Sequence, residues 1–366
     1  MSALRPRRAD PAASAVRWLL GSQLVMFTGL AAVFPVAALY VRNRGGSAVA
    51  IGLFIAGPMV LNTLVQVPAG HLADKIGRRP LLIGARVGYA AVSFALFADR
   101  GPLWALALLR AGQGGCSGAY EPALRAVLAD LTPPQRRAER YSQLQAAEMV
   151  GLLIGPAIGG AVALWRDNGI FLCSGVAVLL STLAMVNVPE TRVAAVAGEP
   201  VTTPGWWRRR GILVPCIGLG AVGLVFTMYD VVWPQYLDAR GYGTLVIGLS
   251  ITLFAVPLLI LARPGGRLAD RADRRLILGV CLALIGACAV TYPELRSLAV
   301  ILTVGTVEAC AIVMVEPSLF AVIAESAPAS ARGRAMGIGG FVQFGGAAIG
   351  AGVLGSLYGV AEGLPF

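Results

Sequence analysis

The sequence predicts an all-α protein that crosses a membrane many times, and three observations indicate this class. Of 366 residues, 57% are hydrophobic and only 13% are charged, whereas a soluble domain carries about 25% charged residues. The apolar residues lie in runs of about 20, the length that crosses the hydrocarbon of a bilayer as a helix. Two charged stretches of similar sequence, "PAGHLADKIGRRP" and "RPGGRLADRADRRL", each stand between two such runs.

Charged or Gly/Pro-rich breaks divide the chain into about eleven apolar segments, each expected to be a spanning helix. The first segment is too long for a cleavable signal peptide, so we expect it to be retained. The segments cover residues 17–41, 48–70, 80–98, 102–130, 141–164, 168–188, 211–237, 244–264, 276–293, 297–325 and 334–359.

The lysines and arginines predict the orientation of these segments. With the N-terminus inside, most of the basic residues fall in the inner connections, as the positive-inside rule requires. We therefore expect a multi-pass protein of the cell membrane (inner or plasma membrane) with a cytoplasmic N-terminus. The net charge of +11 is then explained by the cytoplasmic lipid surface, and no nucleic acid partner is expected.

The charged stretches belong to an internal repeat. Gly70 and Asp74 match Gly266 and Asp270 at an offset of 196 residues, and "EPALRAVLAD" matches "EPSLFAVIAE" at an offset of 195. An offset that spans an even number of helices gives two homologous halves of six-helix design with the same orientation. Parallel repeats of this kind place a substrate site between the halves and allow the halves to rock.

The repeat also predicts the division of the chain. We expect a first half at residues 1–188, a cytoplasmic linker at 189–211 and a second half at 212–366. The sequence that would match the sixth helix begins only near residue 363, so the second half is expected to have five helices and to lack a twelfth.

Three motifs resemble those of a known family. "GHLADKIGRRP" is similar to the signature motif between helices 2 and 3 of the major facilitator superfamily, and "RAGQG" resembles a helix 4 motif of that family. "GLLIGPAIGG" is similar to the helix 5 motif of its drug–proton antiporter branch, the multidrug efflux type. The resemblance implies the major facilitator fold and transport by alternating access.

The resemblance also implies that the charged turns latch the two halves together at the cytoplasmic face. Asp74 is a compact anion suited to capping a helix N-terminus or pairing with an arginine. The second copy has Asp273 in place of Gly77, so its turn is expected to differ and its role to be smaller. The alternative is a basic loop that only sets topology. The expected gating residues are Gly70, Asp74, Gly77, Arg78, Arg79, Gly266, Asp270, Arg274 and Arg275.

The helix 5 motif is expected to form a flat face for close helix contact. Three of its glycines are spaced four residues apart, which places them on one side of a helix. Pro156 frees a backbone carbonyl and favours a kink. We expect this face at the boundary between the halves, with simple small-residue packing as the alternative. The motif residues are Gly151, Gly155, Pro156, Gly159 and Gly160.

Ionisable residues inside spanning helices are costly and usually functional. The helical rise places Glu121 and Glu148 at similar depths, so we expect Glu148 near Arg125 or Glu121. Glu316 has Phe320 where Glu121 has Arg125, and it is expected to lack a local counterion. The candidates for proton coupling or substrate binding are Glu148, Asp230, Glu316, Glu121, Glu308, Arg110 and Arg125.

These features predict a secondary active transporter rather than an enzyme. No nucleotide-binding motif is present and His71 is the single histidine, so we expect no cofactor and no metal. The leading hypothesis is proton-coupled export of small apolar or cationic compounds by a monomer in the lipid bilayer. The alternatives are uptake or facilitated diffusion of a metabolite by the same fold, and a truncated carrier that does not transport.

Overall fold

The computed structural model describes residues 11–46, 48–98, 101–191, 205–242, 244–271 and 273–360, and within these ranges every regular element is helical. The expected linker lies partly outside them, since residues 192–204 are not described. The first set of helices is α1 (Pro11–Ala31), α2 (Phe34–Asn43), α3 (Ala48–Ile76), α4 (Arg78–Ala98), α5 (Leu103–Asp130), α6 (Arg137–Ala163) and α7 (Gly169–Leu183). The second set is α8 (Arg210–Thr227), α9 (Trp233–Asp238), α10 (Thr244–Arg271), α11 (Arg274–Thr291), α12 (Leu298–Ser326) and α13 (Arg332–Val360).

All the predicted apolar segments are helical, and two of them are interrupted. The first segment turns at Ala32 and Val33 between α1 and α2, where Pro35 has no N–H to bond the carbonyl of Ala31. The seventh contains a π-helical turn, Met228–Val232, between α8 and α9. Seven helices among the described residues are long and apolar enough to cross a membrane by themselves.

The charged stretches are mostly helix, which corrects the prediction of loops there. Helix α3 continues to Ile76 and α10 continues to Arg271, so each motif forms the last turns of a long helix. Leu, Ala, Lys and Arg all favour helix. The charged residues therefore end the apolar run without ending the helix. The chain reverses at Gly77, whose φ is +112°.

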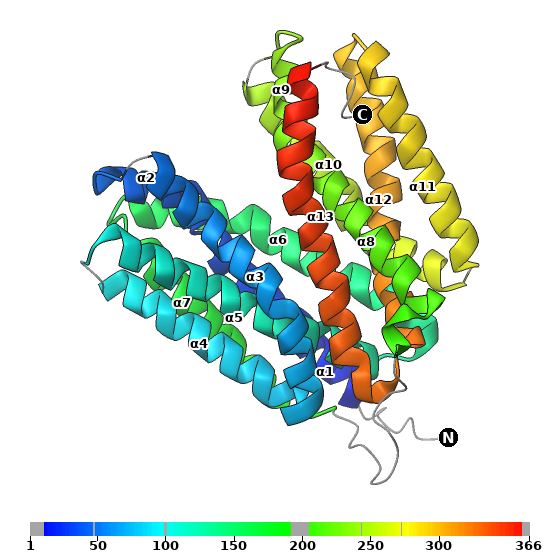
Figure 1. Cartoon of the computed structure of the whole chain (residues 1–366), viewed down its shortest axis with the longest axis horizontal. Helices are drawn as coiled ribbons and strands as arrows, with labels where there is room; N and C mark the ends of the chain where they lie inside the picture. The colour runs from blue at the N-terminus through cyan, green and yellow to red at the C-terminus, as the bar shows by residue number, and fades with distance from the viewer. Residues whose placement is uncertain are drawn as a thin grey trace, which may run out of the picture.

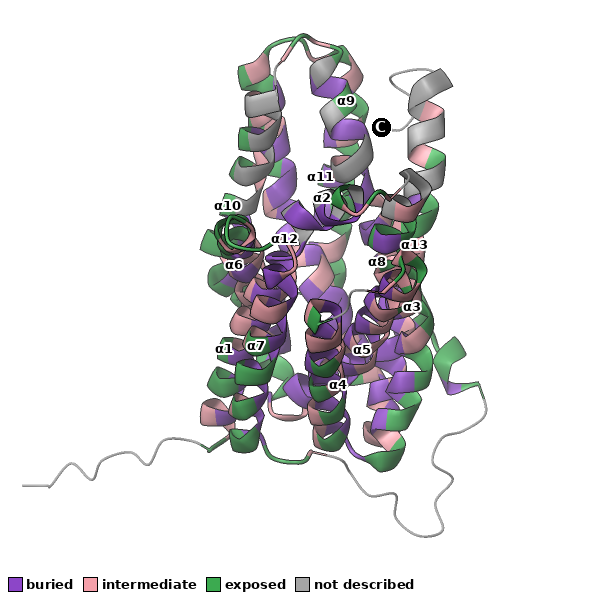
Figure 2. Cartoon of the chain, turned by 90° about the vertical axis from the view of Figure 1, so that its left-hand side faces the viewer, coloured by how far each residue is buried: buried purple, intermediate pink, exposed green. Residues whose placement is uncertain are grey.

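The two sets of helices converge at one end of the molecule and separate toward the other (Figure 1). The described chain begins at the convergent end, and both charged motifs lie there. We call this the basic end. Large apolar side chains such as Leu108, Ile217 and Val290 are exposed on the outside, and Figure 2 shows exposed residues along the outer faces of the helices. An apolar exterior of this extent is typical of a surface that faces lipid.

The glycine face of α6 packs against α1, inside the first half. A Cβ at Gly151 would lie 2.8 Å from the carbonyl oxygen of Leu24, and a Cβ at Gly155 would lie 2.6 Å from that of Thr28. The expectation that this face lies between the halves is therefore wrong. The reason is that α6 contacts the second half through its N-terminal turns, while the motif lies further along the helix. Pro156 is accommodated within the continuous helix α6.

The adjacent glycines of this motif allow a matched test of packing. Gly159→Ala places a methyl group 2.7 Å from the carbonyl carbon of Ala32, whereas a Cβ at Gly160 meets nothing within 4 Å. We expect Gly159→Ala to destabilise the protein by about 1–3 kcal/mol through overpacking. Gly160→Ala should be neutral or stabilise it by up to about 1 kcal/mol. Thermal unfolding in detergent measures both, and equal melting temperatures of the two variants would contradict the described packing.

Candidate functional site

Two aspartates at the basic end each cap a helix of the opposite half. The carboxylate of Asp74, on α3, accepts hydrogen bonds from the backbone N–H groups of Gly333 and Arg334, both at 2.9 Å. The carboxylate of Asp270, on α10, accepts from the N–H groups of Ala138 and Glu139, both at 3.0 Å. These donors lie in the first turns of α13 and α6, where N–H groups have no partner within the helix and the helix dipole favours an anion.

Arginines of the two motifs extend the caps into ion-pair networks at repeat-related positions. Arg274 lies 2.8 Å from Asp270 and 2.5 Å from Glu325. Arg78 lies 3.7 Å from Asp74 and pairs closely with Asp130. Each arginine therefore joins its own aspartate to the acidic end of a second helix in the same half.

Three further contacts of these networks cross the boundary between the halves. Arg332 of the second half pairs closely with Asp130 of the first. The Nη2 atom of Arg274 donates to the carbonyl of Pro134 at 3.1 Å, and the Nη2 atom of Arg78 donates to that of Ala329 at 2.9 Å.

Glycines permit the close approach that the caps need. A Cβ at Gly70 would lie 3.1 Å from the Cα of Arg334, and a Cβ at Gly266 would lie 2.9 Å from the carbonyl oxygen of Ala138. Both neighbours belong to the opposite half, so side chains at these positions would separate the aspartates from the helix ends they cap.

The two turns differ, as the substitution of Asp273 for Gly77 predicts. Asp273 has a φ of −63° and caps α11 by accepting from the N–H of Arg275 at 2.8 Å. At the first turn the carboxylate of Glu190 performs this task, accepting from the N–H groups of Arg78 and Arg79 at 3.1 and 3.0 Å. The difference is confined to the turn, because both aspartates form equivalent caps across the boundary, so the geometry gives no reason for the smaller role expected of the second copy.

A second cluster lies further inside the helices, between the halves. A small pocket is lined by Arg125, Glu148 and Glu316, together with Tyr141, Leu144, Gln145, Pro317 and Phe320. Its volume of about 10 Å³ suffices for roughly one water molecule. The guanidinium of Arg125 lies 4.2 Å from the ring centre of Phe320, close enough for a cation–π interaction.

The structure brings together the residues that helix depth predicted to lie near one another. Arg125 lies 3.9 Å from Glu121, its neighbour one turn away, and lines the same pocket as Glu148. Glu316 was expected to lack a local counterion because Phe320 replaces the arginine in its own helix. Among the described residues no ion pair joins Glu316 to an arginine, although Arg125 of the other half lines the same pocket.

Amide side chains hold the three carboxylates, and the sequence interpretation missed them. Gln23 donates to Glu148 at 3.0 Å and Gln145 donates to Glu316 at 2.7 Å across the boundary. Asn62 and Gln66 both donate to Glu121, at 3.3 and 3.2 Å. The sequence feature that could have identified them is the presence of amide side chains inside apolar runs. An unpaired polar group there costs free energy, so each amide is expected to have a partner.

Two arginines lie outside this cluster. The Nη1 atom of Arg110 donates to Gln113 at 2.6 Å, and Gln113 donates to Ser93 at 2.6 Å. These residues form a buried network within the first half. Arg86, also fully buried, donates to the oxygen of Gln23 at 2.9 Å. Arg86 therefore orients the amide that contacts Glu148, whereas Arg110 makes none of these contacts.

Glu308 belongs to an aromatic cluster of the second half. It is 1% exposed, and its Oε2 atom accepts hydrogen bonds from the hydroxyls of Tyr229 at 2.8 Å and Tyr292 at 2.5 Å. Trp233 and Phe254 pack against these rings. The side chain of Asp230 lies outside the described part of the structure, so its predicted position among these aromatics is untested.

Comparison with known proteins places this architecture in a family. The model of the Major Facilitator Superfamily matches residues 19–351. Multidrug resistance protein MdtH of Aeromonas hydrophila is 26% identical over 346 residues, covering 88% of this chain and 82% of that protein. The uncharacterised MFS-type transporter YqjV of Bacillus subtilis is 25% identical over 292 residues, covering 75% of this chain and 70% of that protein.

Solved structures show the same fold. A bacterial homologue of the iron transporter ferroportin, in an outward-facing state, superposes with a TM-score of 0.78 at 18% identity, covering 96% of this chain and 94% of that one. With its helical architecture and the match over most of its length, this chain belongs to the Major Facilitator Superfamily of membrane transporters.

Proposed function

We propose that this transporter exports small apolar or cationic compounds from the cell in exchange for protons, by alternating access in the plasma membrane. The observation that carries the proposal is the excess of acids in the central cluster. Three carboxylates, those of Glu121, Glu148 and Glu316, are grouped around the single guanidinium of Arg125.

With all three acids ionised, this group carries a net negative charge that a mobile positive charge would balance. An uncompensated carboxylate inside the membrane costs several kcal/mol, and one arginine balances one of the three acids. Amide donors such as Gln23 and Gln145 reduce this cost without neutralising the charge. A proton or a cationic substrate supplies the missing charge, and competition between the two for the same acids is the basis of exchange.

The basic end supports a gating role for the capping aspartates. By the positive-inside rule this end faces the cytoplasm. The described arrangement, with the halves joined there by Asp74 and Asp270, is then the outward-facing state. Each cap contributes about 1 kcal/mol, weak enough to break in every transport cycle.

The relatives support a drug-like substrate. MdtH is named a multidrug resistance protein, and NorA of Staphylococcus aureus, 25% identical over 236 residues, is named a quinolone resistance protein. The aromatic cluster around Glu308 adds rings and a carboxylate that suit a flat or cationic compound.

The first test concerns coupling at Glu148. Glu148→Gln keeps the shape of the protonated acid and cannot titrate, so we expect proton-driven accumulation to fall by about tenfold or more. Substrate exchange without a pH gradient should continue. Flux of a fluorescent cationic dye in proteoliposomes, with and without a pH gradient, measures both.

Glu294→Gln is the matched control, because Glu294 is exposed at the opposite end of the helices. This variant should behave like the unaltered protein. Full gradient-driven transport by Glu148→Gln would remove Glu148 from the coupling mechanism. Dye accumulation in the reverse direction would instead indicate uptake.

The second test concerns the caps. Asp74→Asn or Asp270→Asn turns one acceptor oxygen into an amide donor that faces a backbone N–H. We expect each to cost about 1 kcal/mol and to shift the population about fivefold toward the state open at the basic end. The two variants should be comparable, because the caps are equivalent. Labelling of cysteines introduced between the halves at this end measures the shift.

Asp273→Asn provides the control for the caps. Asp273 caps α11 within its own half, so its substitution should leave the population of open molecules unchanged. If the Asp74 and Asp270 variants label no faster than the Asp273 variant, the caps do not control opening.

A further inference from the structure

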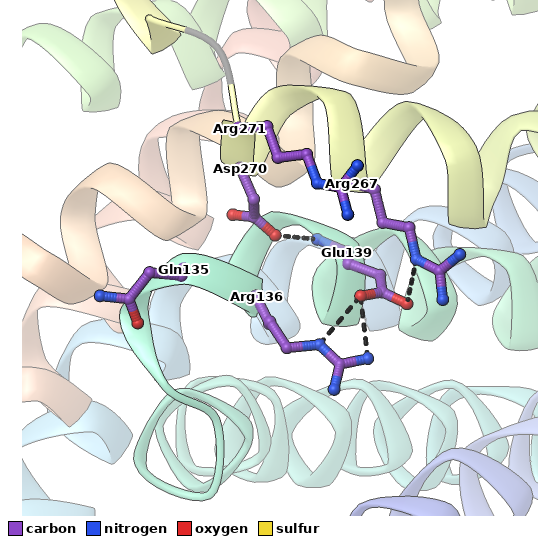
Figure 3. Close-up of a pocket in the computed structure, with 6 residues that line it drawn as sticks. All are labelled: Gln135, Arg136, Glu139, Arg267, Asp270 and Arg271. Carbon is purple, nitrogen blue, oxygen red and sulfur yellow. Dashed lines mark hydrogen bonds and ion pairs between the residues drawn. The ribbon is translucent and has the colours of Figure 1, made fainter.

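A second, larger pocket opens at the basic end, where α6 of the first half meets α10 of the second. Its volume is about 350 Å³, and it is lined by Gln135, Arg136, Glu139, Arg267, Asp270 and Arg271. Figure 3 shows Arg136 and Arg267 converging on Glu139 from the two halves. The central cluster makes no use of this pocket, which shares with the caps only Asp270 and the backbone N–H of Glu139.

The pocket has an excess of positive charge. Glu139 is shared by Arg136 at 3.1 Å, Arg267 at 3.2 Å and Arg263 at 3.9 Å. The carboxylate of Asp270 does little to neutralise the pocket arginines, because its oxygens already accept hydrogen bonds from the N-terminus of α6 and from Arg274. One carboxylate therefore serves three guanidinium groups.

The arginines keep donors available for a ligand. The side chains of Arg136, Arg263 and Arg267 are 48%, 69% and 51% exposed, and the exposed residue Arg271 lines the same pocket. Each guanidinium carries five N–H donors, and a single carboxylate cannot occupy those of three arginines. Such a fork geometry matches the oxygens of a phosphate group.

The exposed face of α10 indicates where the rest of the ligand lies. Val256, Ile260, Arg263 and Arg267 follow one another at helical spacing along one side of the helix. Val256 and Ile260 are 40% and 67% exposed. The face thus changes from apolar to basic toward the end of α10, which is the pattern of a helix passing from acyl chains to headgroups.

We propose that this pocket binds the phosphate headgroup of an anionic phospholipid, with an acyl chain lying along Val256 and Ile260. The continuity of the apolar face with the arginines favours a lipid over a free phosphate ion. Because Arg136 belongs to the first half and Arg263 and Arg267 belong to the second, a bound headgroup bridges the halves. It stabilises the arrangement that is closed at the basic end.

The experiment uses the purified full-length chain in phosphatidylcholine nanodiscs with increasing phosphatidylglycerol. Binding is followed by native mass spectrometry of retained lipid, and closure by the distance between spin labels placed across the basic end. We expect Arg263→Gln/Arg267→Gln to weaken phosphatidylglycerol binding by about tenfold, since the variant removes two of the guanidinium groups that face the headgroup. The lipid should narrow the distance distribution in the unaltered protein and fail to do so in this variant.

Arg208→Gln/Arg210→Gln is the matched control, because these arginines are exposed at the basic end and do not line the pocket. It should bind phosphatidylglycerol like the unaltered protein. Arg271→Gln, a single exposed change, serves as the second test variant if the double variant unfolds in phosphatidylcholine. Equal retention of the lipid by all variants would overturn the proposal. Displacement of the lipid by millimolar inorganic phosphate, with the same closure, would overturn its lipid part in favour of the free ion.

Discussion

The reciprocal capping of helices across the half boundary is the interaction on which the rest of this structure depends. Helices α6 and α13 present unsatisfied N–H groups and the positive ends of their dipoles to the opposite half. Asp270 and Asp74 satisfy those groups, and Gly266 and Gly70 remove the side chains that would hold the backbones apart. The packing of α6 against α10 and α12 then sets how far from the basic end Gln145 and Glu148 lie, and so places them at the level of Glu316 on α12. The arginine pocket depends on the same contact, since its walls come from α6 and α10.

The repeat is symmetric at this latch and asymmetric at the centre. Asp74 and Asp270 each accept two backbone hydrogen bonds at repeat-related positions, and Asp130 and Glu325 each pair with the motif arginine of their own half. In the central cluster, α5 and α12 are repeat-related helices that differ in charge. Phe320 of α12 stands at the position that Arg125 occupies on α5. The proposed latch at the basic end uses equivalent contacts from both halves. A site shared by the two halves, as proposed for the central cluster, needs one arrangement of charge, and the two halves contribute different groups to its lining.

The buried acids are stabilised in two different ways. Glu121, Glu148 and Glu316 are grouped around one arginine and accept hydrogen bonds from several amide side chains. Glu308 instead receives two phenol hydroxyls inside an aromatic cluster. Hydrogen bonds from neutral donors lower the cost of burying a carboxylate, whereas the shared arginine makes the central acids respond to any cation that enters. This difference is the reason for proposing the central cluster, rather than Glu308, as the place where proton and substrate compete.

The sequence by itself determined the helical class, the positions of the apolar segments, the repeat and the depth at which Glu148 meets Arg125. These properties follow from hydropathy, from spacing along a helix and from the offset between matched motifs, all of which are local or periodic. Tertiary structure alone decided which partners the charges take. Asp74 caps a helix some 260 positions away in the chain, Arg125 lies beside Glu316 of the other half, and the glycines of α6 face α1. Spacing along the chain cannot predict these contacts, because they join residues on different helices. Which helices meet, and through which faces, depends on how all of the helices pack together.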